Sequence, residues 1–372
     1  MKKVTALLAG LLFSLNALAD AAATGKAIEE ALNQRDVEAL FRAMDVDAIA
    51  GLVMKDLGLN AADRESVRKG FARALRNNLD IGVRTIEGTK GTAKFLRSGA
   101  RGAKPYALVR YDLGDQGIDY VEYYLTPPGK VEDWYVHSMA TLYSTSARLG
   151  LATVFKTDSM LFSLFGTRLA SDADAKPFRE LRTALQAQDF AGAYRVLETF
   201  PESFRRTRQW VVMRVTYGAR IDDATHRAAL RHLAQSFGAD ADLQFMLIDH
   251  YLFEEQFDRA LASLGALERA IGGEDAATAN LRGSILIGAR RFTDAEKACR
   301  RGMALEPDHE PAYWCLVSVG IGTRSGKIAV EGLKAYEAAF GTEFDLDKLG
   351  QLESYREIAR TPEFAAWKKS RR

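Results

Sequence analysis

The chain has 372 residues, of which 47% are hydrophobic and 27% charged, with 51 Lys and Arg against 49 Asp and Glu. This near-neutral balance lacks the basic excess with which proteins bind nucleic acids, so we expect no nucleic-acid partner. A chain of this length and apolar content is long enough to form two domains, each with its own hydrophobic core.

The first 19 residues have the layout of a secretory signal peptide. Lys2 and Lys3 precede an apolar run over Val4–Leu15, and small residues follow at Ala17 and Ala19. The run is too short to cross a bilayer, and no later stretch reaches the roughly 18 apolar residues that a membrane span needs. We therefore expect cleavage after Ala19 and a mature chain in the bacterial periplasm, with no integral membrane span.

Residues 24–145 predict an α+β domain in which helices precede a four-stranded antiparallel sheet. After the N-cap residue Asn60, the helical spacing of Val67, Phe71 and Leu75 predicts a helix over 60–79. Runs rich in β-branched and aromatic residues, bounded by Gly and Pro, then predict strands. These strands are expected at 92–97, 106–113, 118–125 and 131–143.

The third and fourth predicted strands are expected to form a hairpin across Pro128 and Gly129. One face then carries facing pairs of polar and aromatic residues: Tyr120 with His137, Glu122 with Tyr135, and Tyr124 with Asp133. The other face is more apolar and consists of Val121, Tyr123, Leu125, Trp134 and Val136. Because helices cover the more apolar face, we expect the Glu122–His137 face to be the outer one, either wet or turned toward a partner. A buried carboxylate, histidine and tyrosine could do acid–base chemistry, but on an outer face we expect no active site.

The order of these elements and the strand centred on Trp134 resemble the nuclear-transport-factor-like (cystatin-like) α+β cone. The resemblance implies a curved sheet wrapped around the N-terminal helices. Two interpretations of the interior stay open for Phe71, Tyr123 and Trp134. They either line a pocket between sheet and helices or fill the core as ordinary packing residues.

Residues 146–173 are apolar, with helical spacing, and predict a helix or linker that connects the two domains. The segment 344–372 predicts a capping helix, over which Phe364 and Trp367 fold, and a basic tail.

The region 174–343 contains an internal repeat. Phe257 and Phe292 lie 35 positions apart, and the residues three positions later, Ala260 and Ala295, are alanine in both segments. This spacing resembles that of the tetratricopeptide-repeat (TPR) family, whose units are helix pairs of about 34 residues. In the best unit, Gly283 takes the family's small position and Pro307 closes the unit. We expect four to five units in an all-α solenoid.

The TPR resemblance also implies where a partner binds. In such arrays the first helices of the pairs build an extended face for peptides or proteins. By this analogy the partner-binding residues are Phe245, Asp249, Asn280, Ser284 and Trp314. Two positions depart from the family pattern, since Ala279 stands where an aromatic residue is preferred and Arg282 where Leu is preferred.

Cys299 and Cys315 are the only cysteines and lie at equal distance on either side of Pro307. In a helix–turn–helix hairpin centred on Pro307 they face one another, and an exported protein meets an oxidising environment. Two interpretations stay open: a disulfide between neighbouring repeats, or two reduced thiols packed as small apolar groups.

No motif for catalysis, a metal or a cofactor stands out, and none of these is expected. The five histidines form no H-E-x-x-H or similar cluster, and there is no Gly-rich phosphate loop. The sequence therefore favours an exported, non-enzymatic scaffold that binds another exported or envelope protein or a peptide. The alternative is a carrier of a small hydrophobic ligand, or an enzyme, with a pocket in the N-terminal domain.

Overall fold

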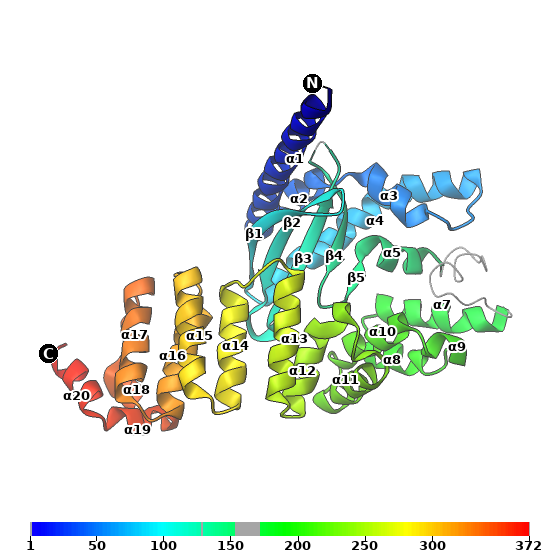
Figure 1. The fold of residues 1–372 in the computed structure, drawn as a ribbon. Helices are drawn as coiled ribbons and strands as arrows, with labels where there is room; N and C mark the ends of the chain where they lie inside the picture. The colour runs from blue at the N-terminus through cyan, green and yellow to red at the C-terminus, as the bar shows by residue number, and fades with distance from the viewer. Residues whose placement is uncertain (1, 128, 153–171, 372) are drawn as a thin grey trace. The chain divides into compact units, whose positions relative to one another are not determined.

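The computed structural model describes residues 2–127, 129–152 and 172–371. These residues form two compact units, Met1–Leu243 and Gln244–Arg372 (Figure 1). The first unit contains helices, an antiparallel sheet and further helices, and the second is all-helical. The predicted fold class, an α+β N-terminal domain followed by helical repeats, is confirmed.

Four helices precede the sheet: α1 (Lys2–Asn33), α2 (Val37–Ala43), α3 (Val46–Met54) and α4 (Ala61–Gly88). Side-chain caps start three of them, because Asp36, Asp45 and Asn60 each accept a hydrogen bond from the backbone N–H three residues later. The N-cap predicted at Asn60 is confirmed. Helix α4 continues past residue 79 because the buried apolar spacing continues through Val83 and Ile86.

The sheet is an antiparallel meander in the order β1-β2-β3-β4-β5. Its strands are β1 (Thr92–Arg101), β2 (Lys104–Asp112), β3 (Ile118–Leu125), β4 (Val131–Val136) and β5 (Thr141–Leu142). The last predicted strand is thus divided in two. Ala140 has a φ of 47°, in the left-handed region that a strand cannot contain, so the chain turns and β5 pairs back onto β4. Helix α5 (Tyr143–Ala152) follows directly.

The predicted hairpin register is confirmed, since Glu122 pairs with Tyr135 and Tyr124 with Asp133. The expected outer, wet face is not observed. Glu122 is only 2% exposed and His137 only 6%. The alternation of residue types shows which face is more apolar, but it does not show whether the other face is also covered.

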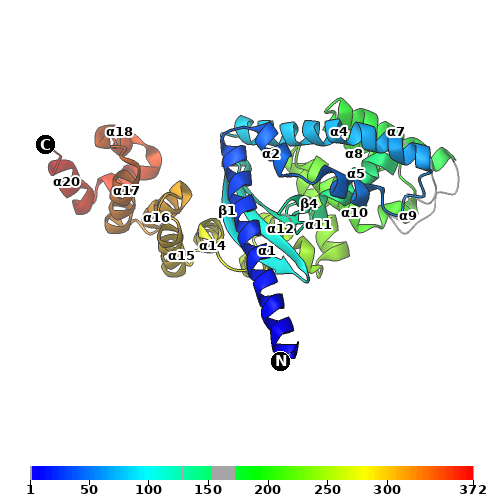
Figure 2. The same ribbon diagram turned by 90° about the horizontal axis from the view of Figure 1, so that it is seen from above.

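Helix α1 lies directly against β1 and β2 (Figure 2). A Cβ atom on Gly25 would lie 2.3 Å from the Phe95 ring and 3.0 Å from Ala107, so a larger residue would push the helix off the sheet. The Asn33 side chain binds the end of α1 to β1. Its amide donates a hydrogen bond to the carbonyl of Ala93 and accepts one from the N–H of Ala93.

The helices after α5 form successive pairs. In the first unit these are α7 (Asp172–Gln186) with α8 (Phe190–Leu197), and, after the short α9 (Glu202–Arg205), α10 (Arg208–Gly218) with α11 (Asp223–Phe237). In the second unit they are α12 (Gln244–Phe253) with α13 (Phe257–Ala270), α14 (Ala276–Gly288) with α15 (Phe292–Leu305), and α16 (Glu310–Gly322) with α17 (Gly326–Phe340). The chain ends in α18 (Leu346–Gln351), α19 (Arg356–Ala359) and α20 (Pro362–Lys369). Most of the predicted connecting segment, residues 153–171, lies outside the described part.

Four of these pairs turn with the same backbone geometry. The second residue before the second helix has a positive φ in each: Gln188, Glu255, Arg290 and Arg324. The next backbone N–H donates to the carbonyl five residues earlier, with N–O distances of 2.7–2.9 Å. The α10–α11 turn lacks this geometry.

The helices α14, α15 and α16 meet around one glycine. Cys299 of α15 and Cys315 of α16 form a disulfide, with Cα atoms 5.5 Å apart. A Cβ atom on Gly283 of α14 would lie 2.4 Å from the sulfur of Cys315 and 2.9 Å from that of Cys299. The disulfide therefore occupies the space that a side chain at residue 283 would need.

We predict that Gly283→Ala destabilises the second unit by about 1–3 kcal/mol, because the added methyl group overpacks this joint. Urea unfolding of the full chain, followed by circular dichroism, measures the loss. The control is Ser284→Ala at the exposed neighbouring position, which should change stability by less than about 0.5 kcal/mol. Equal stability of the two variants would contradict the prediction, because it would show that the joint accommodates the added methyl group.

Candidate functional site

The face of the sheet that carries Glu122 and His137 contains an ion network, which is centred on Glu122 of β3. Arg101 of β1 donates two hydrogen bonds to its carboxylate, at 3.1 Å from Nε and 2.6 Å from Nη2. The Tyr124 hydroxyl donates a third at 3.0 Å, and Nε2 of His137 lies 3.3 Å from Oε1. Groups from β1, from β3 and from the turn after β4 therefore converge on one carboxylate.

The network keeps this carboxylate ionised. Burial raises the pKa of Glu122, but hydrogen bonds from His137 and Arg101 outweigh that effect and hold the pKa at about 2. Burial and the charge of Glu122 raise the pKa of the Tyr124 hydroxyl above its usual value of 10.0. Near neutral pH neither group exchanges a proton readily, so this cluster is suited to holding strands together rather than to acid–base catalysis.

Of the three residues considered for a pocket, Phe71 and Tyr123 lie in the core of the first unit, and Trp134 is partly buried. Phe71 is 7% exposed and Tyr123 is 5% exposed. The Trp134 ring stacks on Tyr143 of α5 at a centroid distance of 3.9 Å and lies 6.2 Å from the Tyr123 ring. Tyr123 and Trp134 thus come together as packing partners.

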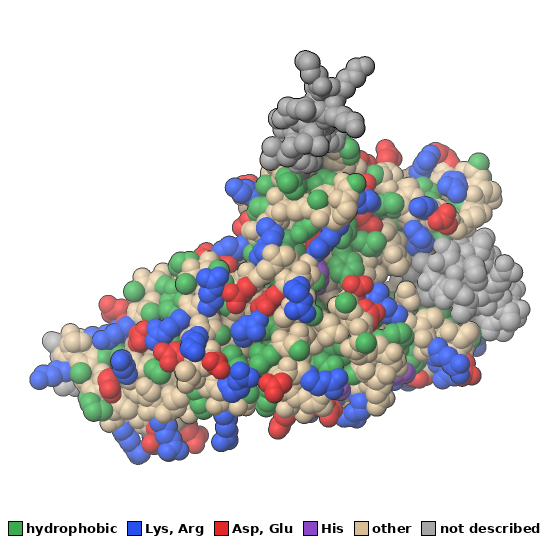
Figure 3. All heavy atoms as spheres, viewed as in Figure 1, with side chains coloured by type: hydrophobic (Ala, Val, Ile, Leu, Met, Phe, Trp, Pro, Cys, Tyr) green, Lys and Arg blue, Asp and Glu red, His purple; other side chains and the backbone are tan. Residues whose placement is uncertain are grey.

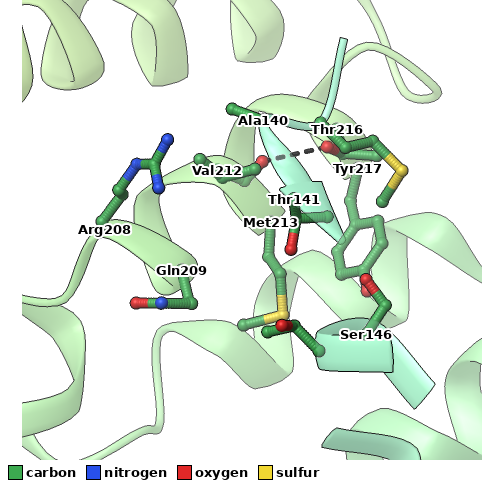
Figure 4. Close-up of a pocket in the computed structure, with 11 residues that line it drawn as sticks. Ala140, Thr141, Ser146, Arg208, Gln209, Val212, Met213, Thr216 and Tyr217 are labelled. Carbon is green, nitrogen blue, oxygen red and sulfur yellow. Dashed lines mark hydrogen bonds between the residues drawn. The ribbon is translucent and has the colours of Figure 1, made fainter. Parts of the chain in front are cut away.

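A cavity of about 90 Å³ lies elsewhere in the first unit, beside α10 (Figure 4). Its helical wall includes Val212, Met213, Thr216 and Tyr217. The facing wall, from the turn after β4 to the start of α5, includes Met139, Thr141, Thr145 and Ser146. No spacing in the sequence joins the two walls, because the facing wall comes from a distant segment.

The first helices of the second unit are mostly buried and expose one narrow stripe each. On α14 the stripe contains Asn280, Ser284 and Gly288, at intervals of four residues. On α16 it contains Trp314, Ser318 and Gly322, at the same interval. Helix α14 contacts α16 directly, so the two stripes belong to neighbouring helices.

The five predicted partner-binding residues fall at corresponding places in successive first helices. Asn280, Ser284 and Trp314 lie on the stripes just described, and Phe245 and Asp249 lie one turn apart on α12. Trp314 is partly buried. Its Nε1 donates to Glu310 at 3.1 Å, and its ring lies 5.0 Å from that of Tyr336.

The second helices carry a different surface, made of charged residues in ion pairs. Arg300 of α15 contacts Glu296 on its own helix and Glu331 on α17. Arg301 of α15 contacts Glu274 at 2.9 Å. Basic and acidic side chains are interspersed over the face seen in Figure 3. The small and polar stripes of α14 and α16 are thus distinct from the charged faces of α15 and α17.

Among the described residues, no group of three His, Cys, Asp or Glu side chains could hold a metal ion. None of the helices in this part of the chain is long and apolar enough to span a membrane.

No family model matches the chain, and no curated protein matches it. It is similar to a solved structure of MamA from Desulfovibrio magneticus RS-1, with 16% identity, a TM-score of 0.38, and coverage of 47% of this chain and 100% of that one. It is also similar to PilW, described as a widely conserved type IV pilus biogenesis factor, with 14% identity, a TM-score of 0.35, and coverage of 54% and 93%. At this level the likeness concerns helical fold over about half of the chain and bears on neither activity nor partner.

We predict that Glu122→Gln lowers the free energy of unfolding at pH 7 by about 3 kcal/mol, the equivalent of the depressed pKa. A carboxylate with a depressed folded-state pKa contributes stability above its unfolded pKa and loses it as the pH falls through its folded pKa. The difference from wild type should therefore shrink between about pH 4.5 and pH 2.

Urea unfolding at a series of pH values measures this difference. Glu65→Gln, at an exposed residue of α4 that pairs with Lys69, is the matched control. A Glu122→Gln effect that does not vary with pH, or that is no larger than the control's, would contradict the assignment.

Proposed function

We propose that this chain is an exported, non-enzymatic scaffold that binds a protein or peptide along the first helices of its second unit. The observation that carries the proposal is the contrast between helix faces. The stripes on α14 and α16 leave small and polar positions open to an extended segment. The charged residues of α15 and α17 are already engaged with one another.

Three features support export to the bacterial periplasm. The first 19 residues have the layout of a signal peptide. Among residues 18–33, the part of α1 whose side chains the structure describes, the first buried residue is Ala21, just after the expected cleavage site. The Cys299–Cys315 disulfide is of a kind that persists in oxidising compartments.

The partner that fits this location is another exported or envelope protein. The stripes expose neither a basic cluster nor a broad apolar patch, so recognition would rest on backbone and polar contacts from Asn280 and Ser284, with Trp314 as the aromatic anchor.

We predict that a photo-crosslinking amino acid at Ser284 traps a discrete partner in the periplasm of the source cells. The control places the same amino acid at Lys297 on α15, whose side chain is 75% exposed. Adduct from Ser284 should fall about tenfold when Ser318→Arg blocks the stripe on α16. Equal adducts from both positions, or none from Ser284, would contradict a binding face on the first helices.

A further inference from the structure

The cavity beside α10 has the composition of a binding site for a small molecule. Figure 4 shows Met213 and Tyr217 of α10 reaching toward Thr141 and Ser146 on the facing wall. A volume of about 90 Å³ is several times the roughly 10–15 Å³ that one water needs by the same measure. The space is therefore large enough for a molecule about the size of one ring.

The body of the cavity is apolar and adaptable. Met139 and Met213 contribute flexible, polarisable side chains that fit irregular ligands, and Val212 adds a rigid apolar surface. Thr216 behaves as an apolar residue here, because its hydroxyl already donates to the carbonyl of Val212 at 3.0 Å.

Apart from Gln209 and Arg208, the polar residues that line the cavity carry hydroxyls. In the described part of the chain, Tyr217, Thr145 and Ser146 make no side-chain hydrogen bond, so their hydroxyls are available to a ligand. Burial raises the pKa of the Tyr217 hydroxyl to about 12, so it stays protonated and can donate.

The charge at the edge of the cavity disfavours an anionic ligand. Arg208 is the only cation among the lining residues, and its Nε lies 3.1 Å from Asp240. A second carboxylate, that of Asp242, lies 3.4 Å from Nη2. With two carboxylates already beside it, the guanidinium has little charge to offer a ligand carboxylate.

We infer that this cavity binds a small neutral molecule, with one apolar ring or short chain and one hydroxyl or carbonyl group. The apolar part would contact Met139, Val212 and Met213, and the polar group would pair with the hydroxyls of Tyr217 and Ser146. This site goes beyond the partner-binding face and lies apart from Phe71, Tyr123 and Trp134, where the sequence suggested a pocket.

The test uses the full chain with ¹³C-labelled methionine methyl groups and 4-methylphenol as the probe. Saturable shifts of the Met139 and Met213 resonances are expected, while Met246 and Met303 of the second unit should not move. Toluene, which lacks the hydroxyl, should bind about two- to tenfold more weakly, as expected for loss of one hydrogen bond. Benzoate should bind more weakly than 4-methylphenol.

Two variants separate the site from general surface binding. Ser146→Trp fills the cavity from an exposed position and should abolish the shifts. Ser236→Trp, at an exposed residue of α11, should bind as wild type does. Unmoved Met139 and Met213 resonances, equal shifts of all methionines, or wild-type binding by Ser146→Trp would overturn the site. Equal affinity for toluene would overturn its hydrogen-bonding part.

Discussion

The helix pairs of the second unit bury apolar residues between their own two helices and against the neighbouring pair. One such contact is at Gly283, where the absence of a side chain lets three helices surround the Cys299–Cys315 disulfide. The last pair has no following pair, and the short helices α18–α20 take its place, with Phe364 and Trp367 packed in one cluster with Val330 and Leu333. Because this stacking buries most of α14 and α16, only a narrow stripe of each remains to contact a partner.

A different constraint holds the first unit together. Its sheet is buried on both faces, and the second face contains a carboxylate, a histidine and several tyrosines. A buried carboxylate is costly unless donors surround it, and Arg101, Tyr124 and His137 do so for Glu122. The same saturation that makes burial tolerable leaves Glu122 without a proton to exchange near neutral pH. A cluster that resembles an active site in its residue types is therefore better explained as a structural network.

Features set by local chemistry could be predicted from the sequence. The Asn60 cap, the bounds of β3 and the β3–β4 register follow from capping, alternation and a short turn. The repeat was visible where the family's small and aromatic positions recur, as at Gly283 and Phe292. The α10–α11 pair does not share the common turn of the other pairs.

Features that depend on distant segments could not be predicted. The burial of the face that carries Glu122 cannot be read from the alternation of residue types in β3 and β4. The cavity beside α10 joins Met139 to Met213 through folding alone, so no spacing rule identifies it. The division of the last strand was also missed, because Ala140 is an ordinary residue for a strand in the sequence and adopts a left-handed conformation only in the fold.

We propose that a covalent bridge closes the helical repeats at the Gly283 joint, in a protein that works outside the reducing cytosol. Alkylation of the native protein, purified from the source cells and denatured without reductant, tests both parts at once. If the bridge is present, we expect no alkylated cysteine and a linked peptide pair that contains Cys299 and Cys315. Two alkylated cysteines would contradict it.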